Sequence, residues 1–427
     1  MHRRFFLSLF SAAAVLSSAA TPLVAAEDDP YADWSVTQLV GEAESVLNQA
    51  KTDNIGAESR SRVVYLAAQR LAKSEQPHRA RQFFEKGLQL SPWQIEFYLD
   101  YADVLKTLHE DIEARHWAEH VVELSETEEL RERAAEWLGV APEPPLTVLD
   151  DRLIPLGRPA ICIIPVGKPP MWLVNRCGYA LSAILGLEVF RYPDRIALPP
   201  SNRSALRRWA NQVGNDIHWD HPDIARIMGR LDIRPNKERI ISSTDVLRVM
   251  EAILQDTGTP EQLGNFRKAW DRFKQAGQDE QWDAEKLREH VLAGLGKETN
   301  RSILWVALTE GDLYAGDNNY LFGLAGSPPA CAVVSCARFT AAFNGEPPSA
   351  RRLSERLLKQ LLSSVGTLLG ADRSLDPTCP RSYPNGLQQH DAKGLKLCER
   401  CRQMISASIR QPLPEAPADP FSAPAKK

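Results

Sequence analysis

The sequence predicts an α+β protein in which an N-terminal α-helical repeat domain precedes a mixed α/β domain that carries a helical insertion. Three observations lead to this prediction. Residues 36–140 follow a helical pattern with a 34-residue repeat, a Pro-rich stretch at 142–145 interrupts it, and short β-branched runs separated by helical stretches follow. The 427 residues are enough for two or three domains of ordinary size.

The first 26 residues have the layout of a cleavable signal peptide. A basic start at residues 2–4 is followed by the apolar run 5–15 and by small residues that end at Ala26. The apolar run is short for a membrane span, which favours cleavage over an uncleaved anchor. We therefore expect a secreted or periplasmic protein without a stable membrane span. The formal net charge of -4 gives no global basic signal for nucleic acid, so we expect no nucleic-acid partner.

The next region, residues 27–141, is the predicted repeat domain. The matched pairs are Ala68 with Ala102, Leu71 with Leu105, Ala80 with Ala114, and Phe84 with Ala118. Small residues at fixed places let two antiparallel helices pack closely. The pattern over 61–126 resembles the tetratricopeptide repeat, with flanking helices at 36–50 and 127–138, and the alternative is a generic array of helical hairpins. We expect a protein or peptide partner to bind through these repeats.

The α/β domain is expected at 152–410, after a linker at 142–151. Its predicted strands are 160–166, 187–192, 302–308 and 331–339, and its first predicted helix is 171–185. The region of about 203–298 is polar and helical and forms the predicted insertion. The tail at 411–427 is rich in Pro and Ala and is expected to be disordered.

A long helix near the C-terminus is the segment most informative about function. Apolar residues recur at steps of three and four from Leu353 to Leu369, which predicts an amphipathic helix that ends at Gly370. Downstream of it lie Cys379 and a CxxC pair, Cys398 and Cys401.

This segment resembles the archaemetzincin-type zinc metalloproteases. In that family the helix carries HExxHxxG, and then a third His, a Cys, a second Cys, a Met and a final CxxC follow. With Gly370 in the Gly place, the three His places fall at Ser363, Thr367 and Arg373, and the Glu place falls at Ser364. The resemblance implies a metzincin-like fold, and the segments 154–167, 303–326 and 331–339 also look like strands of the family.

The later places of the motif are partly kept. The first Cys place falls at Ser374, the second at Cys379 and the Met place at Arg381, and the CxxC is present as Cys398 and Cys401. In the family, four cysteines hold a second, structural zinc. The remaining three predict one structural zinc completed by His390, Asp376 or water, and the alternatives are a disulfide from Cys379 to Cys398 or Cys401, or free thiols.

The replaced residues lack the chemistry of a catalytic zinc site. Such a site needs three ligands from His, Asp, Glu or Cys and an open position for water. Ser363 and Thr367 offer neutral hydroxyls, and Arg373 has a fixed positive charge and no lone pair. Ser364 cannot replace Glu as the general base. The resemblance therefore implies that this chain has no catalytic zinc and no hydrolytic activity of the family type.

Two other groups of histidines are candidate metal ligands. The residues from His116 to His120 match the inverted HxxEH pattern with Glu119, although a polar face of the repeat explains them better. His218 and His221 precede a Pro in the insertion and are expected at the surface or at a helix cap. The insertion also contains or adjoins four tryptophans that favour either partner contact or core packing: Trp209, Trp219, Trp270 and Trp282.

Three functions are compatible with these observations. The first is a non-catalytic protein- or peptide-binding scaffold derived from a metalloprotease. The second is a metal-dependent peptidase that uses a site other than the family's, with His218, His221 or His390 as candidates. The third is an assembly factor for exported proteins that acts through the repeats.

Overall fold

The computed structural model describes residues 31–422 apart from 32, 51–59, 93, 126, 142–143, 151–157, 234–240, 273–279, 297–301, 317 and 319. The predicted signal peptide at 1–26 lies outside the described residues. Within them, no helix is both long and apolar enough to pass through a bilayer. The described chain divides into two compact units: residues 197–293 with 311–321 form the smaller one, and the other residues form the larger one.

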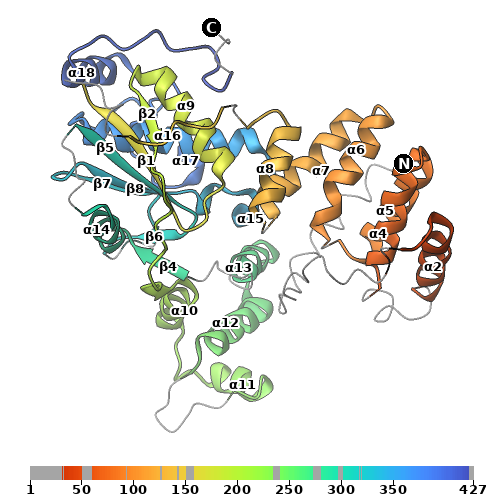
Figure 1. Ribbon diagram of the computed structural model, residues 1–427. Helices are drawn as coiled ribbons and strands as arrows, with labels where there is room; N and C mark the ends of the chain where they lie inside the picture. Colours follow the sequence, from red (N-terminus) through yellow and green to blue (C-terminus); the bar gives the residue numbers. More distant parts are fainter. Residues whose placement is uncertain are drawn as a thin grey trace. The chain divides into compact units, whose positions relative to one another are not determined.

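The larger unit begins with helices, as the repeat pattern predicted (Figure 1). They are α2 (Val36–Gln49), α4 (Arg62–Lys73), α5 (Pro77–Leu90), α6 (Tyr98–Thr107), α7 (Asp111–Leu124) and α8 (Glu128–Trp137), with a 3₁₀ turn at Ile95–Phe97. Consecutive helices pack together, α4 against α5 and α6 against α7. The small residues Ala68, Ala80, Ala102 and Ala114 are fully buried, so close helix packing explains the 34-residue period. The tetratricopeptide class of these helices stays a prediction.

A five-stranded sheet forms the centre of the α/β part. Its order is β2 (Val189–Arg191), β1 (Ala160–Val166), β5 (Ile303–Thr309), β8 (Cys331–Ser335) and β7 (Gly323–Gly326). The first four strands are parallel, and β7 at the edge is antiparallel to β8. Every residue of β1, β5 and β8 is buried, as the continuous β-branched runs predicted for strands covered on both faces.

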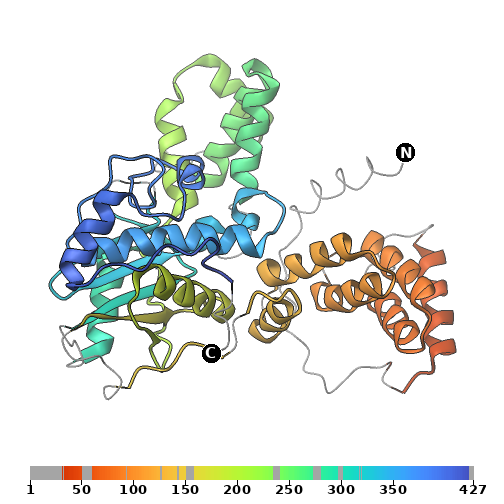
Figure 2. The same cartoon turned by 90° about the horizontal axis from the view of Figure 1, so that it is seen from above.

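Two long helices pack against this sheet and against each other. They are α9 (Met171–Leu185) and α16 (Ala350–Leu368), followed by the short α17 (Leu387–Ala392) and by α18 (Glu399–Ile409). Ser349 caps α16 by accepting a hydrogen bond from the Arg352 amide. The helix ends before Gly370, whose φ of 75° is the left-handed conformation that favours glycine at a helix end. Figure 2 shows α16 running along the sheet.

Acidic side chains of the helical part bind backbone amides at the starts of α/β helices. Glu123 of α7 accepts hydrogen bonds from the amides of Ala341 and Ser349, both at 2.6 Å, at the starts of α15 (Ala341–Asn344) and α16. Glu132 of α8 accepts one from the Trp172 amide at 2.6 Å, in the first turn of α9. Helix N-termini favour such carboxylates, so these contacts join the helical part to the α/β part.

Two predictions about connecting segments are wrong. Residues 144–150 of the predicted linker lie along β2, because the Leu149 amide donates to the Arg191 carbonyl and Leu146 is buried. Residues 411–422 of the predicted disordered tail are also ordered. Arg402 donates to the carbonyls of Leu413 and Pro414, and Phe421 is buried, so a few apolar side chains outweigh the Pro- and Ala-rich composition.

The smaller unit is not purely helical, in contrast to the prediction for 203–298. Its helices are α10 (Ala205–Asp216), α11 (Pro222–Arg230), α12 (Ser243–Thr257), α13 (Pro260–Arg272) and α14 (Ala284–Leu295). A small sheet of β3 (Arg203–Ser204), β4 (Glu280–Asp283) and β6 (Asp312–Tyr314) accompanies them. The strand β6 comes from beyond the predicted insertion, and a three-residue strand is too short to be recognised from its pattern.

The tryptophans of this unit pack against its apolar clusters, and only Trp282 is buried. Trp219 contacts the cluster around Ile224 and Val249, whereas Trp209 and Trp270 contact the cluster around Leu247. Trp282 is buried and donates to the carbonyl of Pro199 at 2.8 Å. All four side chains therefore contribute to packing within this unit, and Trp209, Trp219 and Trp270 remain half-buried.

Candidate functional site

The polar side of α16 is buried, and the chain's own residues 371–393 cover it. Arg356 is 2% exposed and forms an ion pair with Asp391 of α17 at 2.7 Å. The ammonium group of Lys359 donates to the Asp391 carbonyl at 2.9 Å. The amphipathic pattern marked these positions as polar, and the structure places other polar groups of the chain against them.

His390 belongs to this cover and is not a metal ligand in the described structure. Its Nε2 lies 2.9 Å from the Arg356 carbonyl oxygen, and its ring stacks on Phe339 with centroids 4.9 Å apart. Burial lowers the pKa of His390 to about 3, so the ring is neutral at physiological pH. The expectation that His390 completes a cysteine metal site is therefore wrong.

The positions matched to the family's catalytic residues lie together at the C-terminal end of α16. Ser363 is 1% exposed, and its hydroxyl accepts a hydrogen bond from Nη1 of Arg373 at 2.5 Å. The Thr367 hydroxyl donates to the Ser363 carbonyl at 3.1 Å, and the Ser364 hydroxyl accepts from Gln360 Nε2 at 3.2 Å. Ser363 and Thr367 share a helix face, as their i, i+4 spacing predicted.

Arg381 fills the space beside these residues. Its guanidinium is fully buried and donates to the carbonyls of Ser363 at 2.7 Å and of Asp372 at 3.1 Å, and to that of Ala371. A Cβ added at Gly366 would lie 1.8 Å from Nη1 of Arg381. Gly366 therefore makes room for the guanidinium, which binds carbonyl oxygens at the negative end of the helix dipole.

The group at this helix end is positively charged. Arg381, Arg373 and the buried Lys393 have no carboxylate within ion-pair distance among the described residues. Lys393 donates to the carbonyls of Pro380 and Ser382, and burial together with Arg373 and Lys359 lowers its pKa to about 8. A site of hydroxyls and guanidinium groups offers no good ligand for a divalent metal and would repel it.

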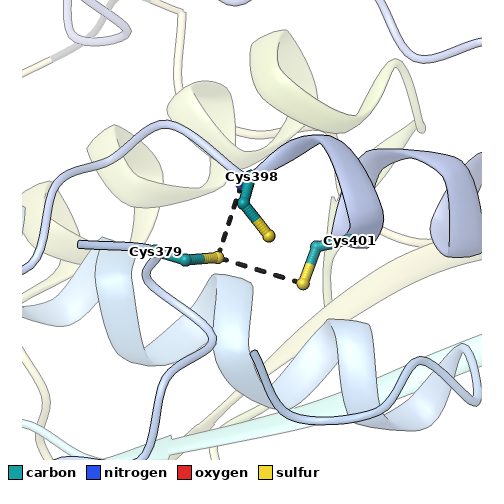
Figure 3. Close-up of side chains that lie close together, drawn as sticks. All are labelled: Cys379, Cys398 and Cys401. Carbon is teal, nitrogen blue, oxygen red and sulfur yellow. Dashed lines mark hydrogen bonds between the residues drawn. The ribbon is translucent and has the colours of Figure 1, made fainter. Parts of the chain in front are cut away.

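The three downstream cysteines form a compact cluster (Figure 3). Their sulfur atoms all lie within 4.8 Å of one another, with the Sγ atoms of Cys379 and Cys401 3.9 Å apart. The Cys398 amide donates to the Cys379 sulfur at 3.5 Å. All three thiols are free in the structure. Three sulfur donors at this spacing fit a zinc ion.

The polar side chain beside this cluster is Ser374 and not Asp376. The Ser374 hydroxyl is 3.3 Å from the Cys398 sulfur. The Asp376 carboxylate instead accepts hydrogen bonds from the amide and hydroxyl of Thr378, which lower its pKa. Burial opposes the thiolate of Cys398, but the hydrogen bonds from Ser374 and from Cys401 hold its pKa below the usual value.

The other histidines do not form metal sites in the described part of the chain. His221 caps α11, and its ring nitrogen lies 3.3 Å from the Asp223 amide, while His218 is exposed. His120 is buried, and its Nδ1 lies 2.8 Å from the carbonyl oxygen of His116. The cysteine cluster is the one group of three or more metal-ligating side chains among the described residues.

The burial of the cations Arg381 and Lys393 at this site was not predictable from the local sequence pattern. A glycine at 366, inside a long helix of otherwise good helix formers, was the available signal for Arg381 because such a glycine marks a close approach. Lys393 and His390 gave no comparable signal, since their burial depends on the path of residues 371–393.

Comparison with known proteins identifies relatives of the C-terminal half. Residues 281–407 match the model of peptidase family M54. The archaemetzincins of Aeropyrum pernix and Pyrococcus horikoshii are each 30% identical, over 137 and 134 residues. These matches cover 32% and 30% of this chain and 68% and 71% of the relatives. The archaemetzincin of Pyrococcus furiosus is 30% identical over 125 residues, which are 29% of this chain and 65% of that protein.

Solved structures of similar proteins were also found. The archaemetzincin of Methanopyrus kandleri matches with a TM-score of 0.36 and 23% identity, over 61% of this chain and 100% of that chain. A zinc-dependent peptidase from Methanocorpusculum labreanum matches with a TM-score of 0.34 and 21% identity, over 58% of this chain and 100% of that chain. The chain thus spans about two thirds of the length of the relatives that it matches by sequence.

Proposed function

The chain belongs to the archaemetzincin family, and we propose that it is a non-catalytic member that binds a protein or peptide. The observation that carries this proposal is the hydrogen bond from Arg373 to Ser363. These residues stand where the resemblance places two of the three zinc-ligating histidines. A guanidinium bound to a hydroxyl occupies the position in which imidazoles would hold a metal.

The loss of zinc at this place removes the means of hydrolysis. Zinc lowers the pKa of a bound water from about 15.7 to about 7, which corresponds to about 12 kcal/mol in the cost of forming hydroxide. Neither Ser364 nor its hydrogen-bond partner Gln360 is a base that replaces this effect. The neighbouring charges of Arg373 and Arg381 further oppose the entry of a cation.

The cysteine cluster is proposed to hold one structural zinc. The donor set of Cys379, Cys398 and Cys401 suits zinc, and the ion would tie the loop after α16 to the start of α18. Its role would be to stabilise residues 371–393, which pack over the polar side of α16. This zinc would contribute to stability and not to catalysis.

Two surfaces support the proposed binding role. The packed helices α4 to α8 are the proposed partner surface, because stacked helical hairpins offer an extended face for proteins. The edge strand β7 has a free side in the described sheet, and such edges pair with extended peptides. With export directed by residues 1–26, the partner would be an exported protein, and a role in its assembly is the related alternative.

Restoration of the family's residues tests this proposal. A variant with Ser363→His, Ser364→Glu, Thr367→His, Arg373→His and Arg381→Met is compared with the wild type in cleavage of a fluorogenic peptide library with added zinc. We expect no cleavage by the wild type at any zinc concentration, and an added zinc per chain in the variant. Zinc-dependent cleavage by the wild type that is lost on His218→Ala or His221→Ala would show a peptidase with a different site and would overturn the proposal.

A further inference from the structure

The cation group at the end of α16 lacks a counter-ion. Arg373 donates one of its five N–H groups to Ser363, and the other four have no acceptor among the described residues. Arg381 donates to carbonyl oxygens and to the Cys401 thiol, and Lys393 donates to carbonyl oxygens, so neither has a carboxylate partner among the described residues. Asp372 is the nearest acidic residue in sequence, and its carboxylate lies 3.5 Å from Arg400.

Arg373 is also the accessible member of this group. Arg381 is fully buried and Lys393 is 3% exposed, whereas the Arg373 side chain reaches the surface. The bond to Ser363 holds one edge of its guanidinium in place and leaves the other edge free. A guanidinium held in this way binds a carboxylate through two parallel hydrogen bonds, with little further loss of conformational entropy.

Two exposed apolar residues lie near Arg373, Tyr383 beside its guanidinium and Leu375 two residues further along the chain. Leu375 is 90% exposed and Tyr383 is 64% exposed, and they are two of the four large hydrophobic residues exposed in the described chain. The Arg373 guanidinium lies 5.8 Å from the centroid of the Tyr383 ring. Ser374 and Ser382 are paired in a parallel β-bridge. Leu375 and Tyr383 directly follow these two residues, so the bridge brings the backbones that carry them close together.

We propose that Arg373, Leu375 and Tyr383 form a binding site for the C-terminal carboxylate of a peptide whose last residue is apolar. The carboxylate binds the free edge of the Arg373 guanidinium, and the last side chain packs on Leu375 and Tyr383. A peptide C-terminus fits better than an acidic side chain because its carboxylate and its apolar side chain branch from one carbon atom. This inference rests on the proposed function, since it names the ligand of the non-catalytic site.

Weak-affinity chromatography on immobilised full-length protein tests the site. The probes are acetylated pentapeptides that end in Leu, Phe or Gly. Each is prepared as a free acid and as a C-terminal amide. We expect the wild type to bind the acids about tenfold or more tightly than the amides, as for a charged hydrogen-bonded pair. Salt should weaken this preference because part of it is electrostatic.

Substitutions distinguish the contribution of the Arg373 charge to peptide binding from that of the apolar side chains Leu375 and Tyr383. Arg373→Gln should abolish the preference for acids, and Arg373→Lys should restore only part of it, because lysine lacks the planar fork. The double change Leu375→Ser and Tyr383→Ser alters exposed side chains only, and should lower the affinity for acids ending in Phe relative to acids ending in Gly. The matched control is Arg226→Gln, which removes an exposed arginine paired with Asp223 and should change nothing.

Three results would overturn the site. They are equal binding of acids and amides, an acid preference that survives Arg373→Gln, and equally tight binding of amidated peptides with an internal Asp. Equal binding of acids and amides would leave the proposed binding function intact while refuting this site. Cleaved peptides in the eluate, identified by mass spectrometry, would instead contradict the proposed function.

Discussion

Arg381 places a buried positive charge at the C-terminal end of α16. Its guanidinium makes hydrogen bonds to the carbonyls of Ser363, Ala371 and Asp372 and is fully buried without a carboxylate partner. Burying a charge is costly unless it is hydrogen-bonded, and three carbonyl acceptors meet that need. The absence of a side chain at Gly366 gives the guanidinium its space.

Substitution of Gly366 tests this packing. Gly366→Ala should destabilise α16 by about 1–3 kcal/mol, because its Cβ would overlap with Arg381 and force it to move. The control is Gly41→Ala in α2, where a Cβ meets no atom within 4 Å and should stabilise that helix by about 0.5–1 kcal/mol. Native-state hydrogen exchange of α16 and α2 reports both changes. Equal stabilisation by the two changes would show that Arg381 does not occupy this place.

At the scale of elements, α16 is buried on most of its surface beyond its first turn, because α17 and the preceding loop cover its polar side. The recurrence of leucines was sufficient to predict the helix and its end at Gly370. The burial of Arg356, Lys359 and Ser363 was not predictable, since it arises from partners such as Asp391 that are distant in sequence. The local apolar pattern predicts that a helix forms, whereas contacts with residues distant in sequence determine which of its side chains are buried.

The same distinction holds elsewhere in the fold. The strands 160–166 and 302–308 were predicted within one residue because continuous β-branched runs are typical of buried parallel strands. The short strands β3, β4 and β6 were missed because two to four residues carry no measurable period. Of the candidate site, the sequence predicted the cysteine cluster and left its fourth ligand open among His390, Asp376 and water, whereas Ser374 lies beside the cluster.

The pH dependence of stability tests the packing of α17 on α16 through His390. Its pKa is lowered by burial to about 3, below the value of about 6.5 expected when unfolded. The unfolded chain therefore binds a proton that the folded chain cannot, and stability is lost as the pH falls below about 6.5. Between pH 7 and pH 5 this loss amounts to about 2 kcal/mol.

Urea unfolding followed by tryptophan fluorescence at both pH values measures this effect. His390→Gln should be less stable than the wild type at pH 7, because it loses the stacking on Phe339. Its stability should nevertheless fall about 2 kcal/mol less than that of the wild type between pH 7 and pH 5. A difference between the two proteins that stays constant with pH would mean that His390 is accessible to protons.

At the scale of the whole molecule, the chain combines a part that is similar to the archaemetzincins with N-terminal helices that lie outside the region of similarity. The family model covers residues 281–407, and α2 to α8 precede it. Glu123 and Glu132 accept hydrogen bonds from backbone amides at the starts of helices in the α/β part, which joins α7 and α8 to that part.

The zinc content of the purified full-length protein tests the central claim most directly. Inductively coupled plasma mass spectrometry after dialysis should find at most one zinc per chain in the wild type. The triple variant Cys379→Ser, Cys398→Ser and Cys401→Ser should hold none, because these thiols are the proposed ligands. A zinc ion that remains in the triple variant and is lost when Ser363 and Thr367 are changed to Ala would contradict the account.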